Sequence, residues 1–253
     1  MKKCLIVCLL ALFAATARAE APLHFLADKD FAPYSMVIDG EPTGIDVDVF
    51  NEAARRAGLE IDIRTHPLET VMEMVQNGSC DGALSLFRSP DRERYALFME
   101  ATPVHYSDYV LFTKVGDRFP FNSYKDLAGK VIGIIVGLDL GPDFDAARAK
   151  GDLIVKEYPD QRAIIAGLLG GEIDAFAGNI DVTYYRLNSM GLTSSVVYLD
   201  HKLLTGKPSY AVLSRAAKRQ DKAEIIQALE KALDQMSEDG TYNTIARRYL
   251  LRF

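Results

Sequence analysis

The residue best placed to bind an anion is Arg92, in the segment SPDR, residues 89–92. An apolar run of strand length, residues 83–87, comes before it and ends at the Ser-Pro pair. Ser89 is a favourable N-cap and Pro90 a favourable first helical residue, so the pattern predicts a buried strand and then a helix whose first turn contains Arg92. Free backbone N–H groups and a guanidinium fork can bind a carboxylate in bidentate fashion. The alternative is an ordinary surface arginine on a short helix.

The first 19 residues have the pattern of a cleaved secretory signal. Two lysines precede an apolar run, residues 5–15, and Ala-Arg-Ala at 17–19 is a typical cleavage site. The apolar run is too short to span a membrane. Cleavage would remove three basic residues and no acidic one, so the net charge would change from −6 to −9. An acidic chain without a basic run argues against nucleic-acid binding, and we expect a periplasmic protein.

Only Cys80 remains beyond the predicted signal, so the mature chain cannot form an intramolecular disulfide. Its position beside a predicted strand favours a small buried hydrophobic residue over a reactive thiol. Hydrolase and metalloprotease motifs are absent from the sequence. The four histidines are far apart in the chain: His24, His66, His105 and His201. We therefore expect no metal ion and no cofactor.

The mature chain alternates predicted strands and helices, which is typical of parallel α/β sheets. A strand is predicted at 23–27, and apolar residues at every fourth position predict a helix from Ile45 to Ala57 that Gly58 ends. A second helix, residues 67–77, leads through Asn-Gly to the strand before Arg92. This helix-to-strand unit returns at 163–179, so we expect two similar lobes. Ligands of open α/β sheets bind beyond the carboxyl ends of the strands, so both units would face a shared cleft.

Two segments would connect these lobes, an apolar strand at 109–113 and the segment 206–213. We therefore expect residues 20–112 and 207–253 to form lobe 1 and residues 113–206 to form lobe 2. Two connections make a hinge rather than a flexible linker. The pattern also predicts two helices near the end of the chain.

A glycine-rich turn follows a predicted strand, residues 130–137, and precedes a helix with Pro142 near its start. Its glycines do not fit G-x-G-x-x-G and no Gly-Lys-Ser/Thr follows, so nucleotide binding is not expected. Backbone N–H groups of this turn could form a second anion contact. Asp139 in the turn could act as a counter-ion for a ligand ammonium group, although capping the next helix is its simpler role.

These segments together resemble the extracytoplasmic solute-binding proteins of the polar amino-acid type, family 3. GIDVDVFNEAA (44–54) is similar to the family's signature around the first long helix, and SPDR is similar to its Thr-Pro-Glu-Arg segment. DLAGKVIG (126–133) resembles the start of the family's second lobe, and EDGTYNTIARRYL (238–250) resembles its C-terminal helix. The resemblance implies a two-lobed, type II periplasmic-binding-protein fold with a two-strand hinge. It also implies that Arg92 binds the ligand carboxylate and that Phe31 stacks on the ligand.

Several positions depart from the family pattern and bear on the ligand. Asn179 stands where the family has an acid that pairs with the ligand ammonium group, and Phe87 stands where it has a hydroxyl. Leu138 and Leu68 replace a threonine and an aromatic residue of the family's site. The carboxylate half of the site is therefore retained and the ammonium half is not. We hypothesise a small carboxylate or atypical amino acid as the ligand. The predicted site consists of Arg92, Phe31, Tyr34, Ser85, Phe87, Leu138, Asp139 and Asn179.

The resemblance implies a monomer that delivers its ligand to an ABC permease of the inner membrane. Two alternatives stay open. The partner could be a membrane sensor, or the fold could carry an enzyme similar to the periplasmic cyclohexadienyl dehydratases, with Glu69 or Glu73 as the base. In each case a ligand that contacts both lobes favours the closed state.

Overall fold

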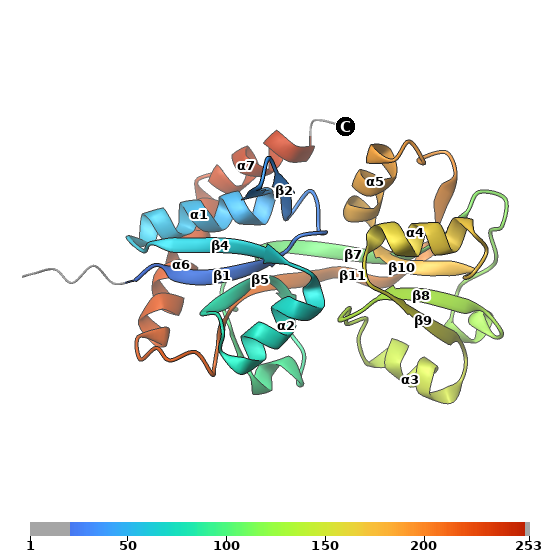
Figure 1. Ribbon diagram of the computed structural model, residues 1–253, viewed down its shortest axis with the longest axis horizontal. Coiled ribbons are helices and arrows are strands. Elements are labelled where there is room, and N and C mark those ends of the chain that lie inside the picture. Colours follow the sequence, from blue (N-terminus) through green and yellow to red (C-terminus); the bar gives the residue numbers. More distant parts are fainter. Residues whose placement is uncertain (1–20, 251–253) are drawn as a thin grey trace, which may run out of the picture.

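The computed structural model describes residues 21–250, which form two α/β lobes joined by two strands (Figure 1). Each lobe contains three parallel strands in the same spatial order, β4-β1-β5 in lobe 1 and β9-β8-β10 in lobe 2. Lobe 1 is built from β1 (Leu23–Asp28), α1 (Ile45–Ala57), β4 (Ile61–His66), α2 (Leu68–Asn77) and β5 (Gly82–Phe87). Lobe 2 repeats this succession with β8 (Val131–Ile135), α3 (Pro142–Lys150), β9 (Ile154–Tyr158), α4 (Gln161–Leu169) and β10 (Ala175–Asn179). The predicted recurrence of one helix-to-strand unit is therefore confirmed.

Two long strands, β7 (His105–Lys114) and β11 (Val196–Ser214), run antiparallel to each other through both lobes. β11 pairs with β5 in lobe 1, and β7 pairs with β10 in lobe 2. Together with β6 (Ala96–Phe98) on β11, they make one nine-stranded sheet. Because residues 109–112 pair with β10, the pairing favours a crossing slightly before residue 112. The lobe boundaries at 112/113 and 206/207 stay predictions.

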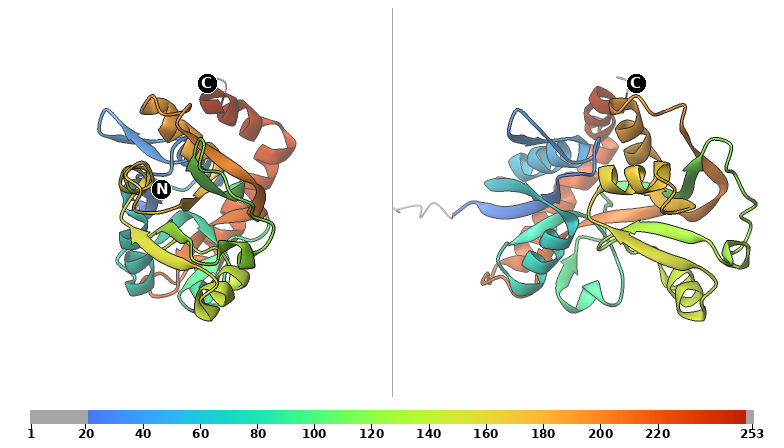
Figure 2. Two further views of the ribbon diagram at one scale, coloured as in Figure 1. Left: turned by 90° about the vertical axis from the view of Figure 1, so that its right-hand side faces the viewer. Right: turned by 45° about the vertical axis from the view of Figure 1, so that its right-hand side comes forward.

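The remaining elements are a hairpin, three helices and two short turns. Helices lie on both faces of the sheets, as the turned views in Figure 2 show. A hairpin of β2 (Met36–Ile38) and β3 (Glu41–Thr43) turns at Asp39 and Gly40, which both have positive φ, as the Asp-Gly pair predicts. The other helices are α5 (Ile180–Ser189), α6 (Lys222–Glu238), α7 (Thr241–Leu250) and two 3₁₀ turns, Arg92–Arg94 and Tyr124–Leu127.

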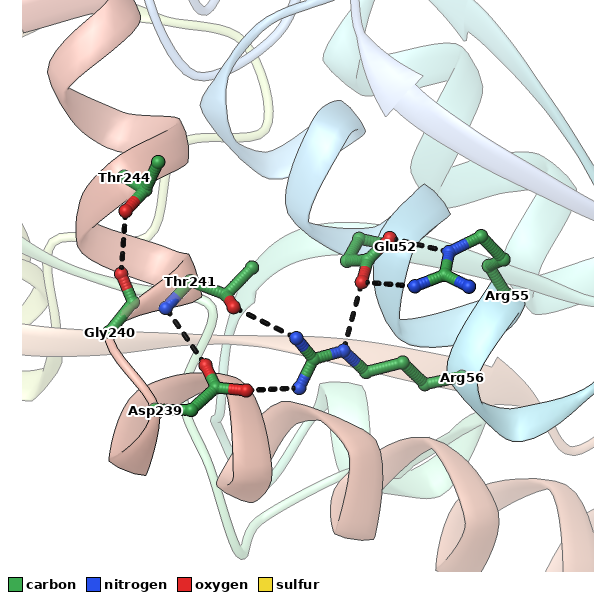
Figure 3. Close-up of polar contacts among 7 residues, drawn as sticks. All are labelled: Glu52, Arg55, Arg56, Asp239, Gly240, Thr241 and Thr244. Carbon is green, nitrogen blue, oxygen red and sulfur yellow. Dashed lines mark hydrogen bonds and ion pairs between the residues drawn. The ribbon is translucent and has the colours of Figure 1, made fainter.

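A cluster of polar contacts joins α1 to the junction of α6 and α7 (Figure 3). Arg56 contacts Asp239 at 2.7 Å, Thr241 at 2.8 Å and Glu52 at 2.9 Å. Hydrogen bonds from Arg55 and Arg56 hold the pKa of Glu52 at about 2. The side chains of Arg56 and Asp239 are 21% and 47% exposed, so water partly screens their ion pair and its contribution to stability is small.

Each lobe has its own hydrophobic core. Phe25 and Phe50 are fully buried in lobe 1, and Phe112 and Phe176 are fully buried in lobe 2. Phe87, at the end of β5, packs into a cluster whose other members come from the hinge strand β7 and from lobe 2. The two lobes therefore contact each other directly.

The predicted helix after Ser89 is wrong in extent. Only one 3₁₀ turn, Arg92–Arg94, forms, and β6 begins two residues after it. Pairing of β6 with β11 draws the chain back into the sheet and ends the turn.

Cys80 is buried as predicted, and desolvation raises the pKa of its thiol to about 12. The predicted signal lies outside the described residues. Within residues 21–250, no helix combines the length and apolar character that crossing a membrane requires.

Replacing Gly44 by alanine is expected to lower the free energy of unfolding by about 3 kcal/mol. Gly44 has φ of 129°, and a Cβ there would lie 2.4 Å from the Tyr34 carbonyl oxygen. Gly58→Ala is the control, because Gly58 also has positive φ but no atom within 4 Å of the added Cβ, and we expect a loss of about 1 kcal/mol. Urea unfolding followed by circular dichroism measures both. Equal losses would show that the close approach at Gly44 has no effect.

Candidate functional site

Two small cavities, of about 40 and 50 Å³, lie between the lobes at the carboxyl ends of the parallel strands. Both are lined by Asp28, Phe31, Leu68, Tyr109 and Leu138. The first also contacts Ser85, Phe87, Arg92, Gly137 and Asp139, and the second also contacts Asp30, Asp160, Gln161 and Asn179. Cavities of this size hold only a few water molecules each. A larger solute therefore requires the lobes to separate or the cavities to merge.

Arg92 bridges the two lobes. Its side chain is buried, and its Nη1 donates to the Phe87 carbonyl at 3.0 Å while Nη2 donates to the Gly137 carbonyl, across the cleft, at 2.9 Å. Among the described residues, no carboxylate forms an ion pair with Arg92, so its charge is available to an anion. The turn presents the Gly137 carbonyl to Arg92, and an anion contact from its N–H groups stays a prediction.

A second cation lies at the same end of the cleft. Lys207 Nζ lies 4.6 Å from the centroid of the Phe87 ring and 3.8 Å from Asp139 Oδ1. Burial lowers the pKa of Lys207, although Asp139 opposes the shift. Asp139 Oδ1 also accepts from the Gly141 N–H at 2.8 Å, just before α3. Asp139 therefore stabilises the turn before α3, a role close to the predicted capping of that helix.

Asp28, the last residue of β1, lines both cavities and is absent from the predicted site. Desolvation raises the pKa of its carboxyl group from 3.8 to about 7, and the negative charge of Asp30 adds to the shift. An acidic residue directly after a buried strand, at the carboxyl edge of the sheet, is the sequence signal that marks Asp28. Gln161 and Tyr109 also line the cavities and carry no comparable signal.

Asp28→Asn is expected to remove a pH dependence of stability between about pH 4 and pH 7. Because the folded pKa of about 7 lies above 3.8, the native state holds a proton there that the unfolded chain releases. The stability of the unsubstituted protein therefore falls as the pH rises through this window. At 1.36 kcal/mol per unit, and with the side chain still in contact with the cavities, we expect a loss of about 2 kcal/mol.

Urea unfolding at about pH 4.5 and about pH 8 measures this effect. Asp62→Asn, a neutral substitution of an aspartate on β4 whose side chain is 44% exposed, is the control and should keep the dependence. If Asp28→Asn and the unsubstituted protein lose the same stability on raising the pH, Asp28 does not titrate in this window.

The structure brings most of the predicted site together. Phe31 and Leu138 line both cavities, Ser85 and Phe87 line the first, and Asn179 lines the second. Tyr34 lines neither cavity.

Tyr34 instead joins the lobes. Its ring stacks on His105 with centroids 4.1 Å apart, and its hydroxyl donates to Asp181 Oδ2 of α5 at 2.8 Å. An ion pair between Arg186 of α5 and Asp30, at 3.2 Å, adds a second contact between the lobes. Figure 1 shows α5 on the side of lobe 2 that faces lobe 1. The loop after β1 thus supplies both cavity-lining and interlobe residues.

The family model described as bacterial extracellular solute-binding proteins, family 3, matches residues 23–252. The chain belongs to this family. It is similar to the histidine-binding periplasmic protein of Escherichia coli (strain K12), with 24% identity over 244 residues that cover 93% of this chain and 90% of the relative. The predicted family is therefore confirmed.

Solved structures show the fold of this solute-binding protein. An ancestral arginine-binding protein bound to arginine has a TM-score of 0.77 at 19% identity, covering 91% of this chain and 98% of its own. A histidine kinase sensor domain with similarity to periplasmic binding proteins also has a TM-score of 0.77, at 20% identity, covering 91% of this chain and 96% of its own. The predicted two-lobed α/β fold is therefore confirmed.

Proposed function

We propose that this solute-binding protein captures a small carboxylate or amino-acid-like solute in the periplasm and delivers it, as a monomer, to an ABC permease. The observation that carries the proposal is Arg92, a buried guanidinium between the lobes that donates to two carbonyl oxygens and forms no ion pair with a carboxylate of the described residues. A ligand carboxylate would replace these neutral acceptors by a charged one, and hydrogen bonds between charged partners are stronger. Relatives named as a probable amino-acid-binding protein, in Bacillus subtilis (strain 168), and as a periplasmic histidine-binding protein support an amino-acid-like ligand and a periplasmic location.

Binding would work by closure about β7 and β11. A solute that contacts both lobes stabilises the closed arrangement, which is the state that a permease would recognise. Arg92 already contacts lobe 2 through Gly137, so a carboxylate at Arg92 would meet both lobes. Cleavage of the predicted signal, residues 1–19, is part of this proposal. A membrane sensor is the alternative partner.

A thermal-shift screen tests the proposal. Amino acids, 2-oxo and 2-hydroxy acids, aromatic acids and small dicarboxylates are each added at saturating concentration, and the matching primary amides serve as controls. At a concentration about 100 times its Kd, a ligand of the native state should raise the melting temperature by about 5–10 °C. Equal shifts with an acid and with its amide would refute carboxylate recognition.

Asp28 favours a second candidate function, a lyase on the same fold. A carboxyl group with a pKa of about 7 can both donate and accept a proton near neutral pH, and Asp28 lines the same cavity as Arg92. Neither Glu69 nor Glu73, the predicted bases, lines either cavity. Incubation with prephenate tests this function, because loss of CO₂ and water would give phenylpyruvate. Turnover that Asp28→Asn abolishes would establish the lyase, and prephenate left intact would refute it.

A further inference from the structure

A buried chain of hydrogen bonds runs from lobe 1 through the hinge to Asn179. The Asp46 carboxylate on α1 lies 2.8 Å from His105 Nδ1, and His105 Nε2 lies 3.1 Å from Ser107 Oγ. Asn179 Nδ2 then donates to Ser107 Oγ at 2.9 Å. All four side chains are buried. His105 and Ser107 lie on β7, and Asn179 ends β10 at the cleft.

The backbone decides the direction of this chain. The Val182 N–H of α5 lies 3.1 Å from the Asn179 side chain and can only donate, so the atom facing it is Oδ1 and the atom facing Ser107 is Nδ2. At the other end, the Asp46 carboxylate can only accept, so a neutral His105 ring carries its hydrogen on Nδ1, facing Asp46. Its Nε2 then accepts the hydrogen of the Ser107 hydroxyl.

Asp46 anchors the far end of the chain. Its Oδ2 accepts from the Ser85 hydroxyl as well as from His105, and the side chain is fully buried. The Tyr34 ring covers the His105 ring at a centroid distance of 4.1 Å, which restricts its rotation. Each hydrogen in the chain therefore points toward a fixed carboxylate.

We propose that this chain holds Asn179 as a hydrogen-bond donor toward the cleft, so that the site selects 2-oxo or 2-hydroxy acids over the matching α-amino acids. Asn179 Nδ2 carries a second hydrogen that no described residue accepts, and Asn179 lines the cavity. Reversing the carboxamide would place Nδ2 against the Val182 N–H and break the bond to Ser107. Next to Asn179 Nδ2, a ligand ammonium group, which brings only donors, would meet a donor, whereas a keto or hydroxyl oxygen at this position accepts.

The inference rests on the proposed function, because it takes Arg92 as the carboxylate site. Isothermal titration calorimetry with two matched sets tests it: pyruvate, lactate and alanine, and 2-oxoisocaproate, 2-hydroxyisocaproate and leucine. In at least one set, the oxo or hydroxy acid should bind at least about tenfold more tightly than the amino acid. Equal or tighter binding of the amino acid in both sets, or no binding by any oxo or hydroxy acid, would overturn the inference.

Asn179→Asp reverses the polarity of the site and should shift the preference toward the amino acid by at least about tenfold. Asn122→Asp adds the same charge at an exposed position of lobe 2 and should leave the preference unchanged. A preference that both substitutions change equally would reflect overall charge and refute the role of Asn179.

Variants of Ser107 distinguish a role in positioning Asn179 from a role in stability alone. Ser107→Ala removes the acceptor of Asn179 Nδ2 and should reduce the preference to less than about threefold, while Ser107→Thr keeps the hydroxyl and should restore it. Nitrogen NMR of the unsubstituted protein adds a readout that does not depend on a variant folding. We expect His105 to carry a hydrogen on Nδ1, and a ring protonated on Nε2 alone would overturn the proposed chain.

The two proposals can fail separately. If Arg92→Ala abolishes binding of a preferred amino acid, the carboxylate site stands and only the inference about Asn179 fails. If Arg92→Ala leaves the binding of every acid unchanged, the proposed function itself fails.

Discussion

Arg92→Ala is expected to weaken the binding of a carboxylate ligand by at least about 100-fold. A bidentate contact between guanidinium and carboxylate contributes about 3 kcal/mol, and each 1.4 kcal/mol is a factor of ten in Kd. The side chain is buried between the lobes, so water screens the contact little. Calorimetry with the strongest ligand from the thermal-shift screen gives the two dissociation constants.

Two further variants test whether the loss of affinity is specific to the guanidinium of Arg92. Arg94→Ala removes an exposed arginine of the same 3₁₀ turn, one that pairs with Asp91 at 3.4 Å, and should change the affinity less than about twofold. Arg92→Lys keeps the charge but loses the planar fork, so its affinity should lie between those of the unsubstituted protein and Arg92→Ala. If Arg94→Ala weakens binding as much as Arg92→Ala does, the anion site is not at Arg92.

The order of elements could be predicted from the sequence because its signals are local. Alternating strands and helices, the positive-φ glycines after α1 and α2, and the Asp-Gly hairpin each depend on a few neighbouring residues. The repeat of one unit then predicted two lobes, and the strand orders β4-β1-β5 and β9-β8-β10 show them. The location of Arg92 followed from the same logic, because it lies just beyond a strand end.

The site itself depends on contacts that no local pattern contains. Gln161 lies in a second-lobe helix, and only the closed arrangement of the lobes brings it to the cavity that Phe31 and Asp28 line. Tyr34 is an aromatic residue of the kind that can stack on a ligand, but its ring stacks on the ring of His105 on β7 instead. The helix expected after Ser89 is shortened because β6 pairs with β11, a strand more than 100 residues later in the chain.

Asp46→Ala is expected to lower the free energy of unfolding by about 3 kcal/mol. The substitution leaves the half-buried Ser85 hydroxyl and the buried His105 Nδ1–H as donors without this acceptor. It also removes a negative charge from the first turn of α1, which is worth at most about 1 kcal/mol. Urea unfolding at neutral pH measures the loss.

Asp48→Ala separates the two contributions, because Asp48 lies in the same turn of α1 and its side chain is 31% exposed. It accepts from the Tyr249 hydroxyl at 2.7 Å, and we expect its loss to cost about 1 kcal/mol. A double-mutant cycle of Asp46→Ala with His105→Ala should show a coupling of about 1–2 kcal/mol, since each side chain is the partner of the other. Additive losses, or equal losses for Asp46→Ala and Asp48→Ala, would mean that the buried chain does not act as a unit.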